Sequence, residues 1–289
     1  MENTPAAPFA PPVAPTVNNL FSLGHKLYKS RWGLIVGASV ASVALSWLLG
    51  LVTGFVDAGL FGADALVSPV TMLAQALVGA PLLVGPLYLT ARLSRGEPAE
   101  FQDVLIGFRR WGPVVATAFL VQAAVWVAMI PLGVGMAAMG SNPFGIVVMF
   151  LLGLAALGVT TWLTIRLYFA PLLCADPAGP RPGVTDSIKA SWTITKGHAL
   201  TLFVVSIALA VIGVISALLL VVPFLLYGAP LGFCVGGVAY VLVTHQAGLI
   251  PMAPYDDCPF CKYDLRGTAS STCPECGATV PRPGAAPVS

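Results

Sequence analysis

The sequence predicts an all-α polytopic membrane protein: six transmembrane helices as three hairpins, each preceded by an interfacial amphipathic helix, with a small cysteine-rich module at the C-terminus. The 289 residues are 57% hydrophobic and only 9% charged, with a mean hydropathy of +0.88. About a quarter of the residues in a soluble protein are charged. Six apolar stretches are long enough to cross a bilayer, and four clustered cysteines follow the last one.

The first segment, residues 1–18, is rich in Pro and Ala and contains no Lys or Arg. It also lacks the apolar core of a secretory signal peptide. We therefore expect a disordered tail, followed by a membrane domain over residues 19–250.

Three short cationic segments, residues 20–31, 101–111 and 184–196, each precede a pair of apolar stretches. In the second, Phe101, Val104, Leu105, Phe108 and Trp111 recur at the spacing of one helical face, which predicts an amphipathic helix. Their spacing of roughly 80 residues indicates an internal repeat of an interfacial helix and a helical hairpin. The alternative is three unrelated loops, in which Trp and cations simply favour the membrane interface.

The six predicted spans follow from length, because a hydrocarbon core of about 30 Å needs roughly 20 apolar helical residues. They cover residues 32–56, 71–91, 113–136, 144–166, 199–222 and 228–244. Four prolines lie inside these spans or near their ends: Pro81, Pro86, Pro131 and Pro230. We expect kinks there, because neighbouring helices can satisfy the carbonyls that proline leaves free.

The 14 Lys and Arg residues all lie before span 1, between spans 2 and 3, between spans 4 and 5, or after span 6. The remaining loops carry only Asp57 and Asp64. Because cytoplasmic loops are enriched in Lys and Arg, this pattern predicts a multi-pass protein of the bacterial inner membrane with both termini in the cytoplasm. Lys26, Lys29 and the Arg109–Arg110 pair would also attract anionic lipid headgroups.

Small residues repeat every fourth position in two spans, from Ala38 to Gly54 and from Gly228 to Gly236. Such stripes allow close helix contacts, within the chain or across a homodimer, so the oligomeric state stays open. No ionisable residue lies near the middle of a predicted span, which disfavours a proton-coupled pump. Gln122 is the most central strongly polar residue; an interhelical hydrogen bond is its expected role, and a substrate contact is the alternative.

The C-terminal residues 251–280 contain Cys258, Cys261, Cys273 and Cys276 as two CxxC pairs. Two such pairs can complete a tetrahedral thiolate site, which predicts a structural Zn²⁺ ion. Iron in a similar four-sulfur site is the main rival metal. A cytoplasmic location disfavours disulfides, and no position remains for a metal-activated water. Residues 281–289 are expected to be a second disordered tail.

This cysteine module is not expected to bind nucleic acid, because its acidic residues outnumber Lys262 and Arg266. Four thiolates around a zinc ion add further negative charge, whereas phosphate binding needs a positive surface. A cytoplasmic protein partner, or simple structural support, fits the composition better.

Two resemblances follow from the motifs. The segment RLYFAPLLCADPAGPRPGVTDSIKASWTITKGHALTLF resembles uncharacterised six-helix bacterial inner-membrane proteins and the membrane domain of some glycerophosphodiester phosphodiesterases. Their catalytic domain has no counterpart here. The pattern C-P-x-C-x-Y-D-L-R-G…C-P-E-C-G is similar to a short zinc ribbon found on assorted bacterial membrane and regulatory proteins, which implies the same four cysteines as ligands.

No nucleophile elbow, P-loop, HExxH or dinucleotide-binding glycine motif occurs in the sequence. We therefore expect a non-enzymatic inner-membrane protein, whose zinc ribbon serves protein interaction or structural support. The alternative is a transporter or channel for a small or lipidic solute, which would use Gln122 and the proline-broken helices.

Overall fold

The computed structural model describes residues 14–62, 69–139, 143–179, 182–219 and 221–250, together with Glu275. Within these ranges every regular element is helical. Six helices are long and apolar enough to cross a membrane: Trp32–Leu60, Val70–Ser94, Trp111–Pro131, Val147–Ala175, Ala199–Leu218 and Phe224–Gln246. The six-span prediction is therefore confirmed at the level of helix length and composition, and the chain is a multi-pass integral membrane protein.

The first amphipathic segment and span form α1 (Val17–Ser30) and α2 (Trp32–Phe61). The next span is one broken helix, made of α3 (Pro69–Ala74), the π-helical turn η1 (Gln75–Gly79) and α4 (Ala80–Ser94). The prediction that Asp57 lies in a loop is wrong, because α2 continues past it. Its buried carboxylate accepts from the backbone N–H groups of Val70 and Thr71, at 3.0 and 2.9 Å, and so caps the start of α3.

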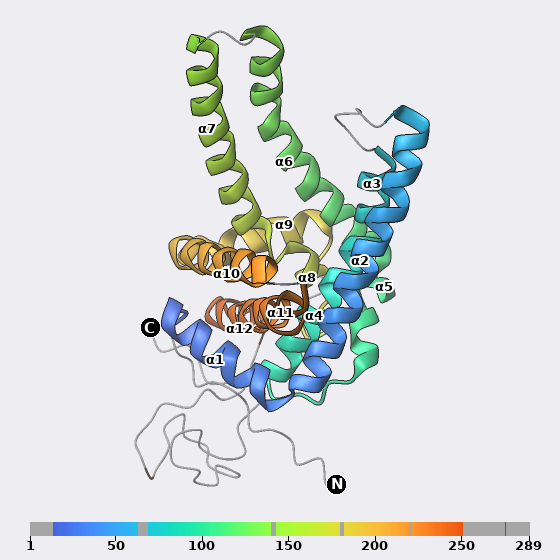
Figure 1. The fold of residues 1–289 in the computed structure, drawn as a ribbon. Coiled ribbons are helices and arrows are strands. Elements are labelled where there is room, and N and C mark those ends of the chain that lie inside the picture. The colour runs from blue at the N-terminus through green and yellow to red at the C-terminus, as the bar shows by residue number, and fades with distance from the viewer. Residues whose placement is uncertain are drawn as a thin grey trace.

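The second amphipathic segment is a 3₁₀ turn, η2 (Phe101–Leu105), followed by the short α5 (Ile106–Arg109). Of the predicted apolar face, Val104 is buried against the protein, whereas Phe101, Leu105, Phe108 and Trp111 are exposed. The next two spans are α6 (Trp111–Met139) and α7 (Pro143–Leu167), which lie side by side (Figure 1). A short α8 (Ala170–Ala175) continues from α7 after a turn.

The last part of the chain begins with α9 (Val184–Thr195) and the apolar α10 (Ala199–Leu219). The final span consists of α11 (Val221–Pro223), a second π-helical turn η3 (Phe224–Gly228) and α12 (Ala229–Gln246). In Figure 1, α10 and α12 run across the view, whereas α6 and α7 run upward. The helix pairs thus leave the shared core in different directions.

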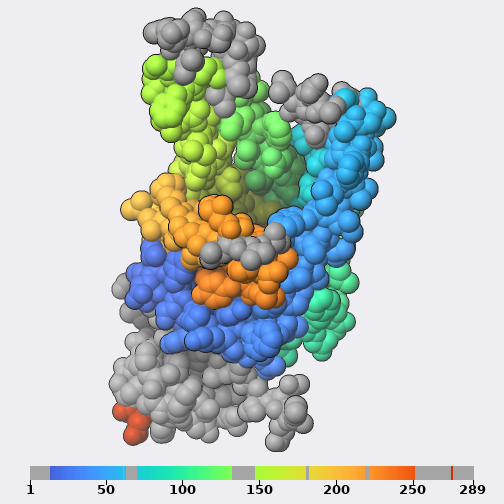
Figure 2. Space-filling model, in the orientation of Figure 1, coloured from blue at the N-terminus to red at the C-terminus, as the bar shows by residue number. Residues whose placement is uncertain are grey.

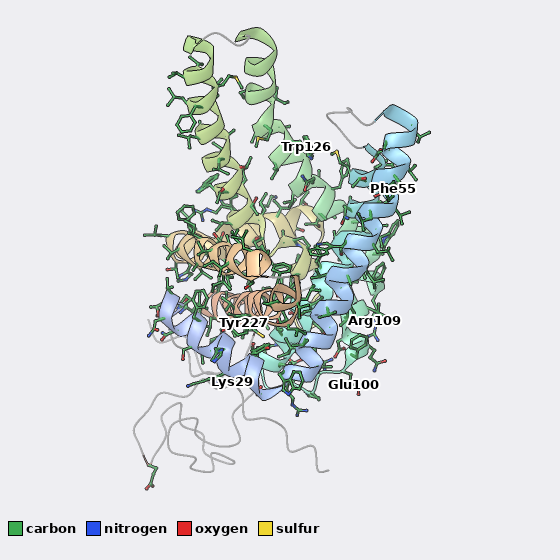
Figure 3. All side chains as sticks on the ribbon, viewed as in Figure 1. Lys29, Phe55, Glu100, Arg109, Trp126 and Tyr227 are labelled. Atoms are coloured by element: carbon green, nitrogen blue, oxygen red, sulfur yellow. The ribbon has the colours of Figure 1, made fainter. Side chains whose placement is uncertain are left out.

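The core lies where α1, α4, α8 and α12 meet, and its largest fully buried side chains include Tyr240, Phe169 and Leu89. In the last span, 67% of the 18-residue apolar window is buried inside the protein, against 11% in each of the two spans formed by α6 and α7. Large apolar side chains cover the outer helices; Phe55 projects outward from α2 (Figure 3). This distribution fits helices that present apolar side chains to lipid and bury small or polar ones against each other.

Only some residues of the two predicted small-residue stripes lie in close contact with a neighbouring helix. Ala38, Ser42 and Ser46 are buried on α2, but a Cβ at Gly54 would meet open space. In α12 the close approach occurs at Gly236, and also at Gly237, where a Cβ would collide with Thr90 and Ala91 of α4.

Candidate functional site

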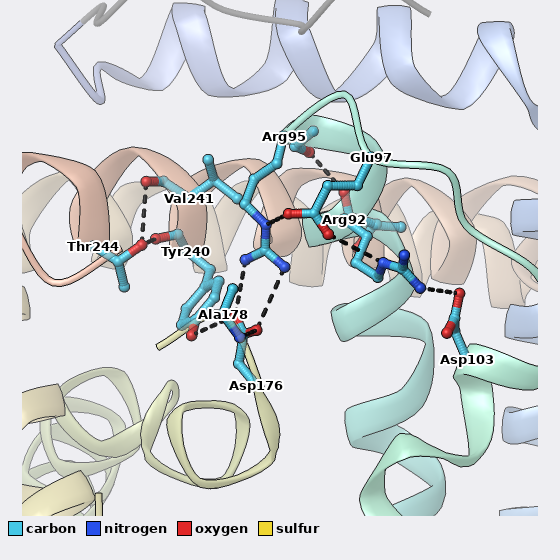
Figure 4. A network of polar contacts seen from close by, with 11 residues as sticks. Arg92, Arg95, Glu97, Asp103, Asp176, Ala178, Tyr240, Val241 and Thr244 are labelled. Atoms are coloured by element: carbon cyan, nitrogen blue, oxygen red, sulfur yellow. Dashed lines mark hydrogen bonds and ion pairs between the residues drawn. The ribbon is translucent and has the colours of Figure 1, made fainter. Parts of the chain in front are cut away.

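A buried polar hub joins the C-terminal ends of two helices to the interior of a third (Figure 4). Arg95, directly after α4, donates from Nη1 to Asp176 Oδ2 at 2.8 Å, and Asp176 directly follows α8. The Tyr240 hydroxyl of α12 donates to the same carboxylate oxygen at 3.0 Å. The side chains of Arg95 and Asp176 are only 2% and 1% exposed, so the pair is shielded from water. We call Arg95, Asp176 and Tyr240 the hub triad.

Three further ion pairs extend the hub toward η2. Glu97 accepts from Arg95 Nε at 2.6 Å and from Arg92 Nε at 3.1 Å. Arg92 also donates to Asp103 at 2.8 Å, and Asp103 in turn accepts from the backbone N–H of Glu100. Burial alone would lower the pKa of Arg95, but Asp176 and Glu97 outweigh burial and raise that pKa. Arg95 therefore stays charged, and the network links α4, η2, α8 and α12 through paired charges.

The even-numbered spans break at a motif, Ala-Pro-Leu, that occurs three times, at residues 80–82, 170–172 and 229–231. Because proline has no N–H, it leaves the carbonyl four residues earlier without its helical partner. At Pro81 and Pro230 these carbonyls belong to Leu77 and Leu226, each the third residue of a π-helical turn. At Pro171 the helix instead ends, which leaves carbonyls of its last turn free.

Each freed carbonyl accepts a hydrogen bond from another amphipathic segment or from its junction with the next span. Trp111 Nε1, at the start of α6, donates to Leu77 O at 2.7 Å. The Ser191 hydroxyl of α9 donates to Arg166 O at 2.8 Å. The Tyr28 hydroxyl of α1 donates to Leu226 O at 2.9 Å. The first break is thus bonded by the second segment, the second by the third, and the third by the first.

Glycines lie four positions before two of these donors, Tyr28 and Trp111, and bring the segments close to the broken helices. A Cβ at Gly24 would lie 2.7 Å from Val235 Cγ2 of α12, and one at Gly107 would lie 2.8 Å from Pro81 Cα. Ser191, fully buried, precedes Thr195 by four residues, and Thr195 also donates to Arg166 O, at 3.4 Å. Positions i and i+4 share a helix face, so contact and donor lie on the same side of α1 for Gly24 and Tyr28, and of α9 for Ser191 and Thr195.

Burial raises the pKa of the Tyr28 phenol above its ordinary value, with smaller contributions from Tyr227 and Cys234. The phenol therefore keeps its proton and remains a donor to Leu226 O. Around this bond, the rings of Tyr28 and Tyr227 meet edge to face, with centroids 5.5 Å apart.

The cations predicted to contact lipid headgroups have different surroundings. Lys26, Lys29 and Arg109 are exposed, whereas Arg110 donates to Cys174 O at 2.8 Å and so supports α8. Arg166 lies over the rings of Trp162 and Trp192, at 5.4 and 5.5 Å from their centroids. Tryptophan is typical of the membrane–water interface, which fits the ends of these helices.

The predicted metal ligands Cys258, Cys261, Cys273 and Cys276 lie outside the described residues. Among the residues that are described, no group of three or more His, Cys, Asp or Glu side chains could hold a metal ion. Cys174 and Cys234 are free and buried in the core. Cys174 shares hydrogen bonds with the hydroxyls of Thr117 and Ser187, at 3.2 and 2.8 Å, which is a packing role.

Sequence reasoning missed the hub triad, because Arg95 and Asp176 each look like an ordinary charge at the end of a span. The breaks of the even-numbered spans did have a signal in the sequence. The repeated Ala-Pro-Leu motif marks equivalent points in spans 2, 4 and 6. No protein family, no curated protein and no solved structure was found to match this chain.

Proposed function

We propose that this chain is a non-enzymatic scaffold of the bacterial inner membrane, with both termini in the cytoplasm. Three units, each an amphipathic segment and a helical hairpin, would form its membrane domain. The C-terminal cysteines Cys258, Cys261, Cys273 and Cys276 would bind one structural Zn²⁺ and form a ribbon that contacts a cytoplasmic protein.

The three carbonyl contacts support the repeat. Each unit supplies a donor to the broken helix of the preceding unit, and Tyr28 of the first unit bonds the third. Contacts between α1 and α12, and between η2 or α5 and α4, follow the same order. Such a cycle closes the described part of the chain on itself, so α1 and α12, its first and last helices, hold each other in place.

The main support for a scaffold is that the charges of the hub triad are paired with each other. Ion-coupled transporters keep ionisable groups available to their cargo along a central path. Here the two described carboxylates inside or next to spans, Asp57 and Asp176, are engaged by backbone N–H groups, by Arg95 and by Tyr240. Their hydrogen bonds hold helices together, which favours a structural role over transport.

The zinc ribbon rests on sequence spacing alone. Two CxxC pairs separated by a short segment can supply four thiolates in a tetrahedron. When bound, Zn²⁺ would supply most of the folding free energy of so small a module. The distribution of Lys and Arg supports a cytoplasmic location for this module, and thiols stay reduced in that compartment.

The test compares the full-length protein with the double variant Cys258→Ser and Cys261→Ser. We expect about one zinc per chain in the purified wild type, none in the variant, and loss of a stoichiometric cytoplasmic partner while the spans still insert. Ser270→Ala with Ser271→Ala, in the same segment but without thiolates, is the matched control. Iron, no metal, or partner binding that survives the cysteine changes would contradict the proposal.

A further inference from the structure

A cavity of about 560 Å³ lies between the broken helix α3–η1–α4 and α6. Figure 2 shows the molecule hollowed between α6 and the α2–α3 pair, and Figure 3 shows Trp126 on the side of α6 that faces α3. The cavity lies within the spans Val70–Ser94 and Trp111–Pro131, and Gln122 lies near the midpoint of the second. On the first span the lining runs from Thr71, near its start, to Leu83, near its middle, so the cavity lies at a depth where an occupant from the bilayer can enter.

Two amide side chains lie on opposite walls of this cavity and are its most polar groups. Gln75 projects from the π-helical turn, and its Nε2 donates to Ser46 O at 3.1 Å. That nitrogen carries a second hydrogen that can serve a ligand. Gln122 faces it from α6 and is exposed. An amide exposed to hydrocarbon is unfavourable, so a ligand that accepts hydrogen bonds is preferred over a lipid chain.

Apart from one hydroxyl, the rest of the lining is apolar, and none of it is charged. Met72, Leu83 and the indole of Trp126 contribute side chains, and Thr71 adds a hydroxyl at one end. The Asp57 carboxylate already accepts from two backbone N–H groups, one of them that of the lining residue Thr71, and is not itself part of the lining. The occupant is therefore neutral, with a flat face for Trp126 and carbonyl acceptors for the two amides.

We propose that this cavity binds the ring of an isoprenoid quinone, a neutral lipid with two carbonyl oxygens. Such a ring lies at mid-depth because it has no charged headgroup, whereas glycerolipid headgroups stay at the surface. Cavities of a few hundred Å³ commonly enclose ligands of this size. Its isoprenoid tail would leave between α3 and α6 into lipid.

The experiment measures binding of decylubiquinone to the full-length protein in lipid nanodiscs, with empty nanodiscs to subtract partition into lipid. We expect saturable binding that weakens at least fivefold in Gln122→Leu and in Trp126→Ala. Gln246→Leu makes the same change at the exposed end of α12 and should bind like wild type. Circular dichroism and size-exclusion profiles check that each variant is folded.

Competition distinguishes the chemical classes. Dioctanoylglycerol, a neutral lipid without a ring, should not displace decylubiquinone. Equal binding by wild type and Gln122→Leu, or displacement by dioctanoylglycerol, would overturn the quinone assignment. Neither result would affect the zinc ribbon or its partner, which are measured separately.

Discussion

Replacing Asp176 by Asn tests the hub triad most sharply, because it removes one charge and changes little volume. Arg95 would remain 2% exposed and charged, with its pKa raised by its neighbours. Breaking a buried ion pair by removal of one partner costs about 3–5 kcal/mol. Glu97 still pairs with Arg95 Nε at 2.6 Å, so we expect the lower end, about 3 kcal/mol of unfolding free energy.

The assay is unfolding by sodium dodecyl sulfate in mixed micelles, followed by tryptophan fluorescence. Asp186→Asn is the matched control, since Asp186 is exposed in the first turn of α9 and should cost about 0.3–1 kcal/mol. The double variant Arg95→Met with Asp176→Leu should recover much of the loss, because replacing both charges leaves no unpaired ion. A cost for Asp176→Asn no larger than that for Asp186→Asn would refute the reasoning.

Three further predictions test the contacts around the hub and the C-terminal module. Trp111→Phe should destabilise the protein by about 1 kcal/mol in the same unfolding assay, because Leu77 O loses its donor, whereas Trp32→Phe, 64% exposed, should be neutral. Gly24→Ala should lower the free energy of unfolding by about 1–3 kcal/mol, because the added Cβ clashes with Val235. Gly54→Ala, where a Cβ meets open space, should raise it by up to about 1 kcal/mol. Equal effects would contradict the close approach of α1 to α12. Chelation should release zinc with loss of structure in the cysteine module only, and a chelator-induced change in the helical signal of the spans would contradict an independent module.

The sequence was sufficient for the number and position of the spans because bilayer thickness fixes helix length. Predicted boundaries failed where tertiary contacts extend a helix: α2 runs past Asp57 because that carboxylate caps α3. Proline kinks were expected at Pro81 and Pro230, and the structure shows π-helical turns just before both. Composition alone could not give the different directions of the helix pairs.

The site was harder to predict than the spans. Gln122 was identified as the most central polar residue, but its neighbour across the cavity, Gln75, becomes relevant only once η1 and α6 lie side by side. Likewise, Arg95 and Asp176 are 81 residues apart in the chain, and their pairing depends on the packing of α4 and α8. The four predicted metal ligands remain a prediction from spacing.

The closed order of the three units is tested most directly by cross-linking α1 to the last broken helix in native membranes. Cysteines at Tyr28 and Tyr227, whose rings lie 5.5 Å apart, would be introduced after the four C-terminal cysteines are changed to Ala. A short bis-maleimide should join these two positions within one chain, and should not join Tyr28→Cys to Leu157→Cys on α7. No cross-link between positions 28 and 227, or equal yields for both pairs, would contradict the closed order of the three units.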